Sequence, residues 1–337
     1  MDKTPIMTNS KYTGHSDRGL LNVGWICNLR CTHCFFHETP KKWKPFYRIL
    51  LHLLLIRICG MRKVDITGGE PTLYPRLMLL LRVCRVLGFT ETRINTNGTQ
   101  NCDELAKIKG VVFQTSFHSP NREDLIKFMG ADVLDKVTDF HQKHKDQIIY
   151  TNVCINQYST DIPNLLWKIQ DISGVKHFNL KSIDYEHDHA EQYPEHRHMA
   201  EINESIRRLF WGCPDATLDT TCFPFCLFGE NVRGNVRYGT DPVVSKLNPN
   251  HQNPFISKTT PKWWYIPYIL GINRREYEAR AIKNNYHDRQ IVRTEKCKGC
   301  ICVQCPGIKV TYLKRFGDAE LKPITKCPAT KKGHCCG

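Results

Sequence analysis

The sequence has no apolar run long enough to cross a bilayer. Its longest apolar stretch, ILLHLLLIRIC at residues 49–59, is interrupted by His52 and Arg57 and falls short of the roughly 20 residues that a membrane helix needs. We therefore interpret it as a buried helix and expect no membrane association. The N-terminal residues MDKTPIMTNS also lack the apolar core of a secretory signal, so we expect a cytoplasmic protein.

The sequence also has few acidic residues relative to basic ones. Asp and Glu number 33 against 48 Lys and Arg, which gives a formal net charge of +15. This surplus favours an anionic partner, and it leaves open a phosphorylated metabolite, a nucleotide or RNA, and an acidic protein. Because disulfides are rare in the cytosol, the 17 cysteines need another explanation.

The cysteines are grouped along the chain. Cys27, Cys31 and Cys34 form the first group, within CNLRCTHC. A second group, within EKCKGCICVQC near the C-terminus, consists of Cys297, Cys300, Cys302 and Cys305. Cysteines that stand alone are interpreted as small buried apolar residues, and these are Cys59, Cys84, Cys102 and Cys154.

Short β-rich runs alternate with amphipathic stretches through the first half of the chain. Six runs predict strands, at residues 20–26, 63–67, 92–96, 111–117, 148–155 and 175–183. Helices are predicted between them, at 46–59, 76–87, 102–108, 122–144 and 161–172. This alternation specifies parallel βαβ units. We expect an α/β fold, with a partial (β/α)6 TIM-like barrel in residues 1–190 and a cysteine-rich extension in residues 191–337.

Three thiolates at short spacing on one loop can bind a zinc ion or an iron–sulfur cluster. Structural sites of both kinds normally have four protein ligands. Three ligands indicate an open coordination position, like the one that a catalytic zinc keeps for water or substrate. CNLRCTHC follows the first predicted strand, at the barrel edge where such folds carry out chemistry.

This cysteine spacing resembles the signature of the radical SAM superfamily. DITGGEP, NTNG and QTSFH end the second, third and fourth predicted strands and are similar to segments that surround the cofactor in that family. The resemblance implies that Cys27, Cys31 and Cys34 hold a [4Fe–4S] cluster whose open iron binds S-adenosylmethionine. It also implies cofactor contacts from a further set: His33, Phe35, Gly68, Gly69, Glu70, Pro71, Asn97 and Ser116.

The residue types of GGEP agree with that role. A Gly-Gly pair lets the backbone approach a ligand without interference from Cβ, and the carboxylate of Glu70 can pair with the ammonium of the cofactor. An electron delivered to the chelated sulfonium would break a carbon–sulfur bond and give a 5′-deoxyadenosyl radical. The resemblance implies a reductase partner such as flavodoxin or ferredoxin.

The C-terminal cysteines resemble the twitch and SPASM extensions of many radical SAM enzymes. The motif is one residue shorter than the full SPASM pattern, so we expect one auxiliary [4Fe–4S] cluster, ligated by Cys226, Cys297, Cys300 and Cys305. Zinc is the alternative metal. Cys222 is the first alternative ligand, and the C-terminal tail KCPATKKGHCCG is a second source of one. Peptides join the anionic compounds as candidate substrates. The rival interpretation is a non-catalytic basic protein, stabilised by zinc or an iron–sulfur cluster, that binds nucleic acid or transfers electrons.

Overall fold

The structure is a computed structural model that describes residues 18–34, 40–58, 60–181, 198–221, 223, 225–229, 236–238, 291–292, 294–301, 308–309, 313 and 317–325. Within these ranges, eight parallel strands form one sheet whose order follows the sequence. The strands are β1 Arg18–Asn22, β2 Lys63–Thr67, β3 Glu91–Asn95, β4 Val111–Ser116, β5 Ile148–Cys154, β6 His177–Lys181, β7 Thr217–Thr221 and β8 Val236–Tyr238. A separate antiparallel pair consists of β9 Ile291–Val292 and β10 Ile308–Lys309.

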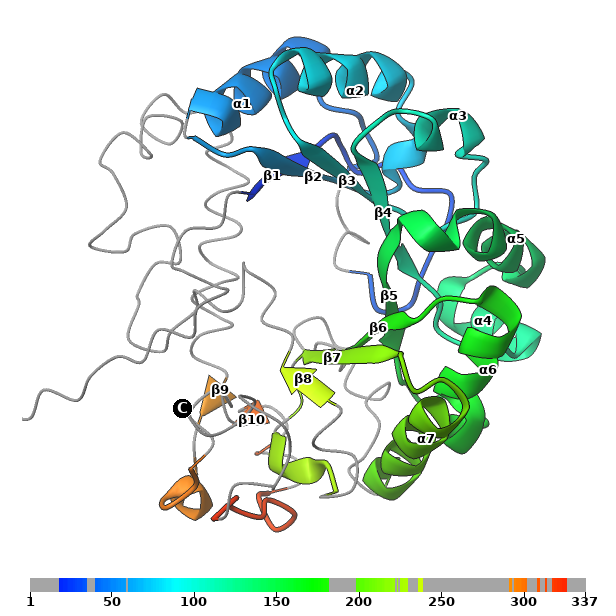
Figure 1. Cartoon of the computed structure of the whole chain (residues 1–337), viewed down its shortest axis with the longest axis vertical. Coiled ribbons are helices and arrows are strands. Elements are labelled where there is room, and N and C mark those ends of the chain that lie inside the picture. The colour runs from blue at the N-terminus through cyan, green and yellow to red at the C-terminus, as the bar shows by residue number, and fades with distance from the viewer. Residues whose placement is uncertain are drawn as a thin grey trace, which may run out of the picture.

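Helices lie along the outer side of the curved sheet (Figure 1). They are α1 Phe46–Ile58, α2 Leu77–Val86, α3 Asp103–Ala106, α4 Arg122–Met129, α5 Leu134–His144, α6 Leu165–Ser173 and α7 Met199–Gly212. Short 3-10 turns are η1 Pro71–Leu73, η2 Lys145–Gln147, η3 Ile162–Asn164, η7 Phe225–Leu227 and η9 Glu295–Cys297. Among the described residues, no helix is long and apolar enough to cross a membrane. The cytoplasmic location stays a prediction.

Alternation along each strand separates an apolar outer face from a polar inner face. The outer-facing residues pack under the helices and form the main core, as in β4, where Val111 and Phe113 are buried. Strand register brings polar residues into a row across the inner face, which runs Ser116, Asn152, Asn179 and Asp219 from β4 to β7. The inner face therefore suits a polar ligand better than an apolar one.

The partial barrel expected from the sequence is confirmed, and its six predicted strands correspond to β1–β6. Two features differ. The helix predicted over residues 122–144 is two helices, because Gly130 adopts a left-handed conformation (φ 75°) and ends α4. The sheet also continues past residue 190 through α7 and β7. The division of the chain into domains at that residue stays a prediction.

Candidate functional site

The cysteine loop is attached to the structure on three sides. Its leading segment, residues 23–26, extends the β1–β2 ladder through the bond from Val23 N to Thr67 O (2.9 Å). On the other side, Trp25 N donates to Lys42 O (3.0 Å). The loop itself is bound to the end of α4, where Thr32 N donates to Phe128 O (2.9 Å). Its position at the carboxyl edge of the sheet is therefore fixed by backbone bonds.

The three predicted cluster ligands are half-buried cysteines. Burial raises the pKa of the Cys31 thiol, and the nearby Cys34 and Cys27 raise it further. Burial also raises the pKa of Cys27. Thiols in such surroundings ionise when a metal centre supplies positive charge. Three soft donors on one loop fit a [4Fe–4S] cluster with an open iron. Their role as ligands stays a prediction.

The two glycines of GGEP lie against the segment that precedes the first cysteine. Gly69 N donates to Gly24 O (3.0 Å), and Glu70 N donates to Ile26 O (2.8 Å). A Cβ at residue 69 would lie 2.3 Å from Ile26 O, and one at Gly68 would lie 2.4 Å from Gly24 O. We expected the missing Cβ atoms to admit a ligand, and the structure shows that they admit the neighbouring backbone.

Glu70 has four hydrogen-bond donors around its carboxylate. Its Oε1 accepts from Thr72 N (3.0 Å), Thr72 Oγ1 (2.6 Å) and Thr96 Oγ1 (2.8 Å), and its Oε2 accepts from Asn97 N (2.7 Å). The side chain is 1% exposed. These bonds cap the η1 turn, which begins at the buried Pro71, and tie it to the end of β3. The carboxylate therefore has a structural role in addition to the cofactor contact that the sequence predicts.

Asn97 lies directly beside the cysteine loop. Its Nδ2 donates to Asn28 Oδ1 (2.9 Å) and lies 4.0 Å from Cys27 Sγ. The Asn97 side chain also accepts from Thr99 N (3.1 Å). Ser116, the other predicted polar contact, lies on the inner face in the row described above. Phe35 lies outside the described residues.

The rings of His33, His118 and Phe128 pack together beside the cysteine loop. The ring of His33 stacks on Phe128 at 4.3 Å and meets His118 edge-on at 5.3 Å. His118 Nδ1 accepts from Cys154 N (3.1 Å), and burial lowers the pKa of His118 well below its usual value. The ligand atoms of His33, His118 and Cys154 all lie within 4.8 Å of one another.

Sequence reasoning did not assign Phe128, Asn28 or Cys154 to the site. Cys154 was interpreted as a buried apolar residue, and it is 6% exposed as expected. Its position at the carboxyl end of β5 was the available signal, because all strand ends of a parallel sheet meet at one edge. No sequence pattern marks Phe128, which reaches the loop from the end of α4.

Three of the four predicted auxiliary ligands lie close together. Burial raises the pKa of Cys226, and the nearby Cys297 and Cys300 add to that rise. A backbone group contacts one of these thiols, since Ile324 N donates to Cys300 Sγ (3.4 Å). Cys305 and the alternative ligand Cys222 lie outside the described residues. The metal at this second site stays a prediction.

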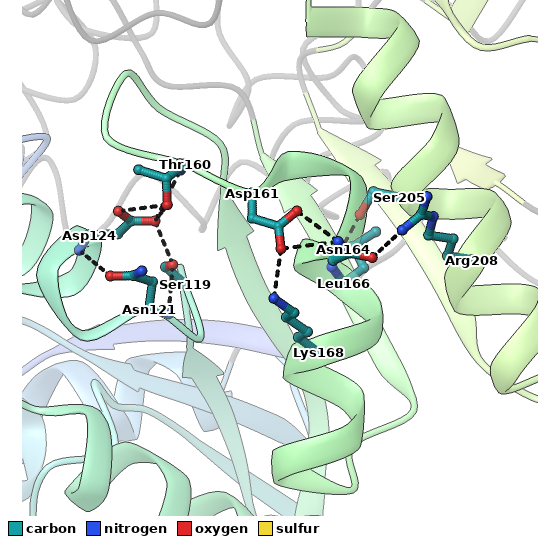
Figure 2. Close-up of polar contacts among 10 residues, drawn as sticks. All are labelled: Ser119, Asn121, Asp124, Thr160, Asp161, Asn164, Leu166, Lys168, Ser205 and Arg208. Carbon is teal, nitrogen blue, oxygen red and sulfur yellow. Dashed lines mark hydrogen bonds and ion pairs between the residues drawn. The ribbon is translucent and has the colours of Figure 1, made fainter.

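A buried carboxylate ties two loops at the same edge of the sheet. Figure 2 shows Asp124 of α4 accepting from Ser119 Oγ (3.0 Å) and Thr160 N (3.1 Å). Ser119 follows His118 after β4, and Thr160 follows β5. Asp124 is 4% exposed. It therefore holds the segments that carry His118 and Cys154 in a fixed relation.

Residues 21–157 match the family model of the radical SAM superfamily. The chain is 31% identical over 86 residues to "S-adenosylmethionine-dependent nucleotide dehydratase" of Thermoplasmatales archaeon (strain ISO4-H5), which covers 26% of this chain and 31% of the relative. It is 25% identical over 192 residues to "Probable GTP 3',8-cyclase" of Saccharolobus islandicus (strain M.14.25 / Kamchatka #1), covering 55% and 62%. Both matches span less than two thirds of the curated relative.

Solved structures show the same fold. Streptococcus suis SuiB aligns with 94% of this chain and 77% of its own, at 18% identity and a TM-score of 0.54. SuiB bound to precursor peptide SuiA aligns with 94% and 76%, at 15% identity and a TM-score of 0.58. Members of the matched family are enzymes that use a [4Fe–4S] cluster and S-adenosylmethionine. Residues 21–157 thus form a radical SAM domain.

Proposed function

We propose that this chain cleaves S-adenosylmethionine reductively at a cluster held by Cys27, Cys31 and Cys34, and uses the product radical to modify a nucleotide. The observation that supports the first part best is the group of three half-buried thiols at the carboxyl edge of the sheet. When bound, the cluster and its cofactor supply an electron and a sulfonium whose cleavage gives the 5′-deoxyadenosyl radical. The match of residues 21–157 to the radical SAM family model favours this enzyme over the non-catalytic alternative.

The chain's own residues would position these groups and exclude water. Gly69 and Glu70 fix the segment before the cysteines through backbone bonds. The ring of His33, which stacks on the buried Phe128, offers a flat surface that suits a planar base. Asn152 and Asn179 offer amide groups for sugar hydroxyls on the inner face, where Asn179 Nδ2 donates a hydrogen bond to Asn152 Oδ1 (3.1 Å).

A nucleotide substrate is supported by three observations. Relatives from two differently named groups, a nucleotide dehydratase and a GTP cyclase, act on nucleotides by name. The net charge of +15 favours an anionic substrate. The inner face of the sheet carries a row of polar side chains. SuiB binds a precursor peptide, but SuiB is only 15% identical to this chain and shares only its fold. A peptide is therefore the second candidate.

The test is anaerobic reconstitution followed by dithionite, S-adenosylmethionine and a panel of nucleoside triphosphates. We expect 5′-deoxyadenosine to form, and to form faster with one of the nucleotides. A variant with Cys27, Cys31 and Cys34 all replaced by Ala should form none. Cofactor cleavage that persists in that variant contradicts the proposed cluster. Stimulation by no nucleotide contradicts the proposed substrate class alone.

A further inference from the structure

Helix α1 carries apolar side chains on two opposite faces. Ile49, Leu53 and Ile56 are buried under the sheet's outer face. At ~100° per residue, a second set falls in a narrow stripe on the opposite side, with exposed fractions as follows: Tyr47 66%, Leu51 41%, Leu54 41% and Ile58 69%. The sequence predicts a buried helix here, and α1 buries one face and exposes the opposite one. A contiguous exposed apolar stripe of this kind marks an interaction surface.

The surroundings of the stripe are basic. Between residues 40 and 90 the sequence contains ten Lys and Arg but only two acids, Asp65 and Glu70. Asp65 is paired with Arg18 (2.7 Å), and Glu70 is buried. Lys41, Lys42 and Arg48 are exposed near the start of α1. Figure 1 shows α1 beside α2, whose exposed residues include Leu79, Arg82, Arg85 and Val86. Such a surface complements an acidic protein that has an apolar patch.

The basic surface is continuous with the cysteine loop. Lys42 O accepts from Trp25 N (3.0 Å), and Lys44 N donates to Val23 O (2.9 Å). These bonds place residues 42–44 alongside the segment that leads into Cys27. Helix α1 also begins at the carboxyl edge of the sheet, because a crossover helix runs back from the end of one strand to the start of the next. A protein bound there would lie next to the cluster loop.

We propose that this surface docks an acidic one-electron donor protein of the flavodoxin or ferredoxin type. The proposal rests on the proposed function, because that function needs one electron for each cofactor cleaved. The donor loses one electron and is oxidised, and the [4Fe–4S] cluster gains that electron and is reduced. We call this surface the donor face, and it consists of Lys41, Lys42, Tyr47, Arg48, Leu51 and Leu54.

Charge reversal on the donor face tests the electrostatic part. The variant is Lys42→Glu/Arg48→Glu, and its control is Lys127→Glu/Lys136→Glu, which makes the same charge change at exposed residues of α4 and α5. The rate of 5′-deoxyadenosine formation is measured with reduced flavodoxin and, separately, with dithionite. We expect the half-saturating flavodoxin concentration to rise at least about tenfold for the donor-face variant. The dithionite rates and the control should stay within about twofold of wild type.

Leu51→Asp/Leu54→Asp tests the apolar part, with Ile126→Asp as the control because all three side chains are 41% exposed. The first variant should weaken flavodoxin-driven turnover and the control should not. Unchanged flavodoxin kinetics, or an equal loss with flavodoxin and dithionite, overturns the proposal. Two further results overturn it: wild type binds phosphatidylserine vesicles, or it dimerises in light scattering, and these variants abolish that behaviour while their flavodoxin kinetics stay unchanged.

A third measurement separates this proposal from the proposed function. If wild type forms no 5′-deoxyadenosine with dithionite, the proposed function fails. The donor face is then tested by titrating the protein into flavodoxin and following flavin fluorescence at low and high salt. Binding that weakens with salt and is lost in Lys42→Glu/Arg48→Glu supports docking, and binding that is equal in wild type and this variant overturns it.

Discussion

Glu70 illustrates how a motif residue acquires a second role in the folded chain. Its place in GGEP predicts a contact with the cofactor ammonium, yet its carboxylate accepts hydrogen bonds from Thr72, Thr96 and the backbone of Asn97. Burial raises the pKa of this carboxyl. A buried carboxylate with this many donors contributes to the position of the strand ends that surround the cysteines.

Glu70→Ala should lower the free energy of unfolding by about 2–3 kcal/mol, because it leaves buried donors without acceptors. Urea unfolding followed by circular dichroism, on anaerobic protein, measures this loss. Glu104→Ala is the control, since that side chain is 73% exposed in its pair with Lys107 and should cost less than about 0.5 kcal/mol. Unchanged stability together with weaker S-adenosylmethionine binding would show that the carboxylate serves the cofactor instead.

At the scale of elements, α5 contacts β4 through His141. His141 Nδ1 donates to Val137 O (2.6 Å), and its Nε2 lies 2.8 Å from Thr115 Oγ1. The side chain is fully buried, and this burial lowers the pKa of His141 to about 4. The folded protein therefore holds this imidazole neutral at pH values where the unfolded chain binds a proton.

A pH dependence follows from that difference. The unfolded state takes up the proton near pH 6.5, so the contribution of His141 is fully present above that pH and is lost as the pH falls toward 4. The loss should reach about 3 kcal/mol, at 1.36 kcal/mol per pKa unit. Urea unfolding at pH 7.5, 6 and 5 measures the part of this loss that occurs above pH 5. His141→Gln, prepared in the same way, should show a shallower decline, and equal slopes would refute the assignment.

The hydrogen bonds from Ser119 and Thr160 to Asp124 allow a second test at the element scale. Asp124→Ala should destabilise the protein by about 1–3 kcal/mol, because Ser119 and Thr160 lose a buried acceptor. The control is Asp161→Ala in the neighbouring cluster of Figure 2. Asp161 pairs with Lys168 while its side chain is 38% exposed, so its loss should cost less than about 1 kcal/mol. Thermal unfolding compares the two variants, and an equal loss of stability in both would argue against this role of Asp124.

Elements were easier to predict than the contacts between them. Strands β1–β6 follow from β-rich runs separated by helical periodicity, and the cysteine loop follows from its spacing. Strand β7, with the sequence TLDTT, is short and mostly polar, so no local pattern distinguishes it from a loop. The bond between Glu70 and Thr96 joins residues that are 26 positions apart. Such a contact depends on how β2 and β3 align, which sequence periodicity does not specify.

At the scale of the whole molecule, two cysteine groups lie at opposite ends of the chain. The first lies on the loop after β1. The second, through Cys297 and Cys300, lies close to Cys226 although a long stretch of sequence separates them. The described thiols of the second group match three of the ligands that we predict for one auxiliary cluster.

Metal analysis of anaerobically purified protein tests this prediction. One auxiliary cluster predicts about eight irons per chain, zinc at the second site predicts about four, and two auxiliary clusters predict about twelve, at four irons per cubane. Cys297→Ala/Cys300→Ala should lower the count from about eight to about four. Stoichiometric zinc in wild type would refute the auxiliary cluster. Cys84→Ala, at a fully buried cysteine on α2, is the matched control and should leave the count unchanged.

The strand order implies that the segments positioning the two sites are synthesised at different times. Each strand of the large sheet pairs with its neighbours in sequence, so the sheet can grow while the ribosome is still working. Among the described residues, the last backbone hydrogen bond to the cysteine loop is at Met129, whose carbonyl accepts from Arg30 N (3.3 Å), whereas Cys300 accepts from Ile324 N. These points are 324 − 129 = 195 residues apart, roughly 10–40 s of synthesis at 5–20 residues per second. The segments that position the three thiols predicted to hold the first cluster are thus synthesised well before the segment that contacts Cys300.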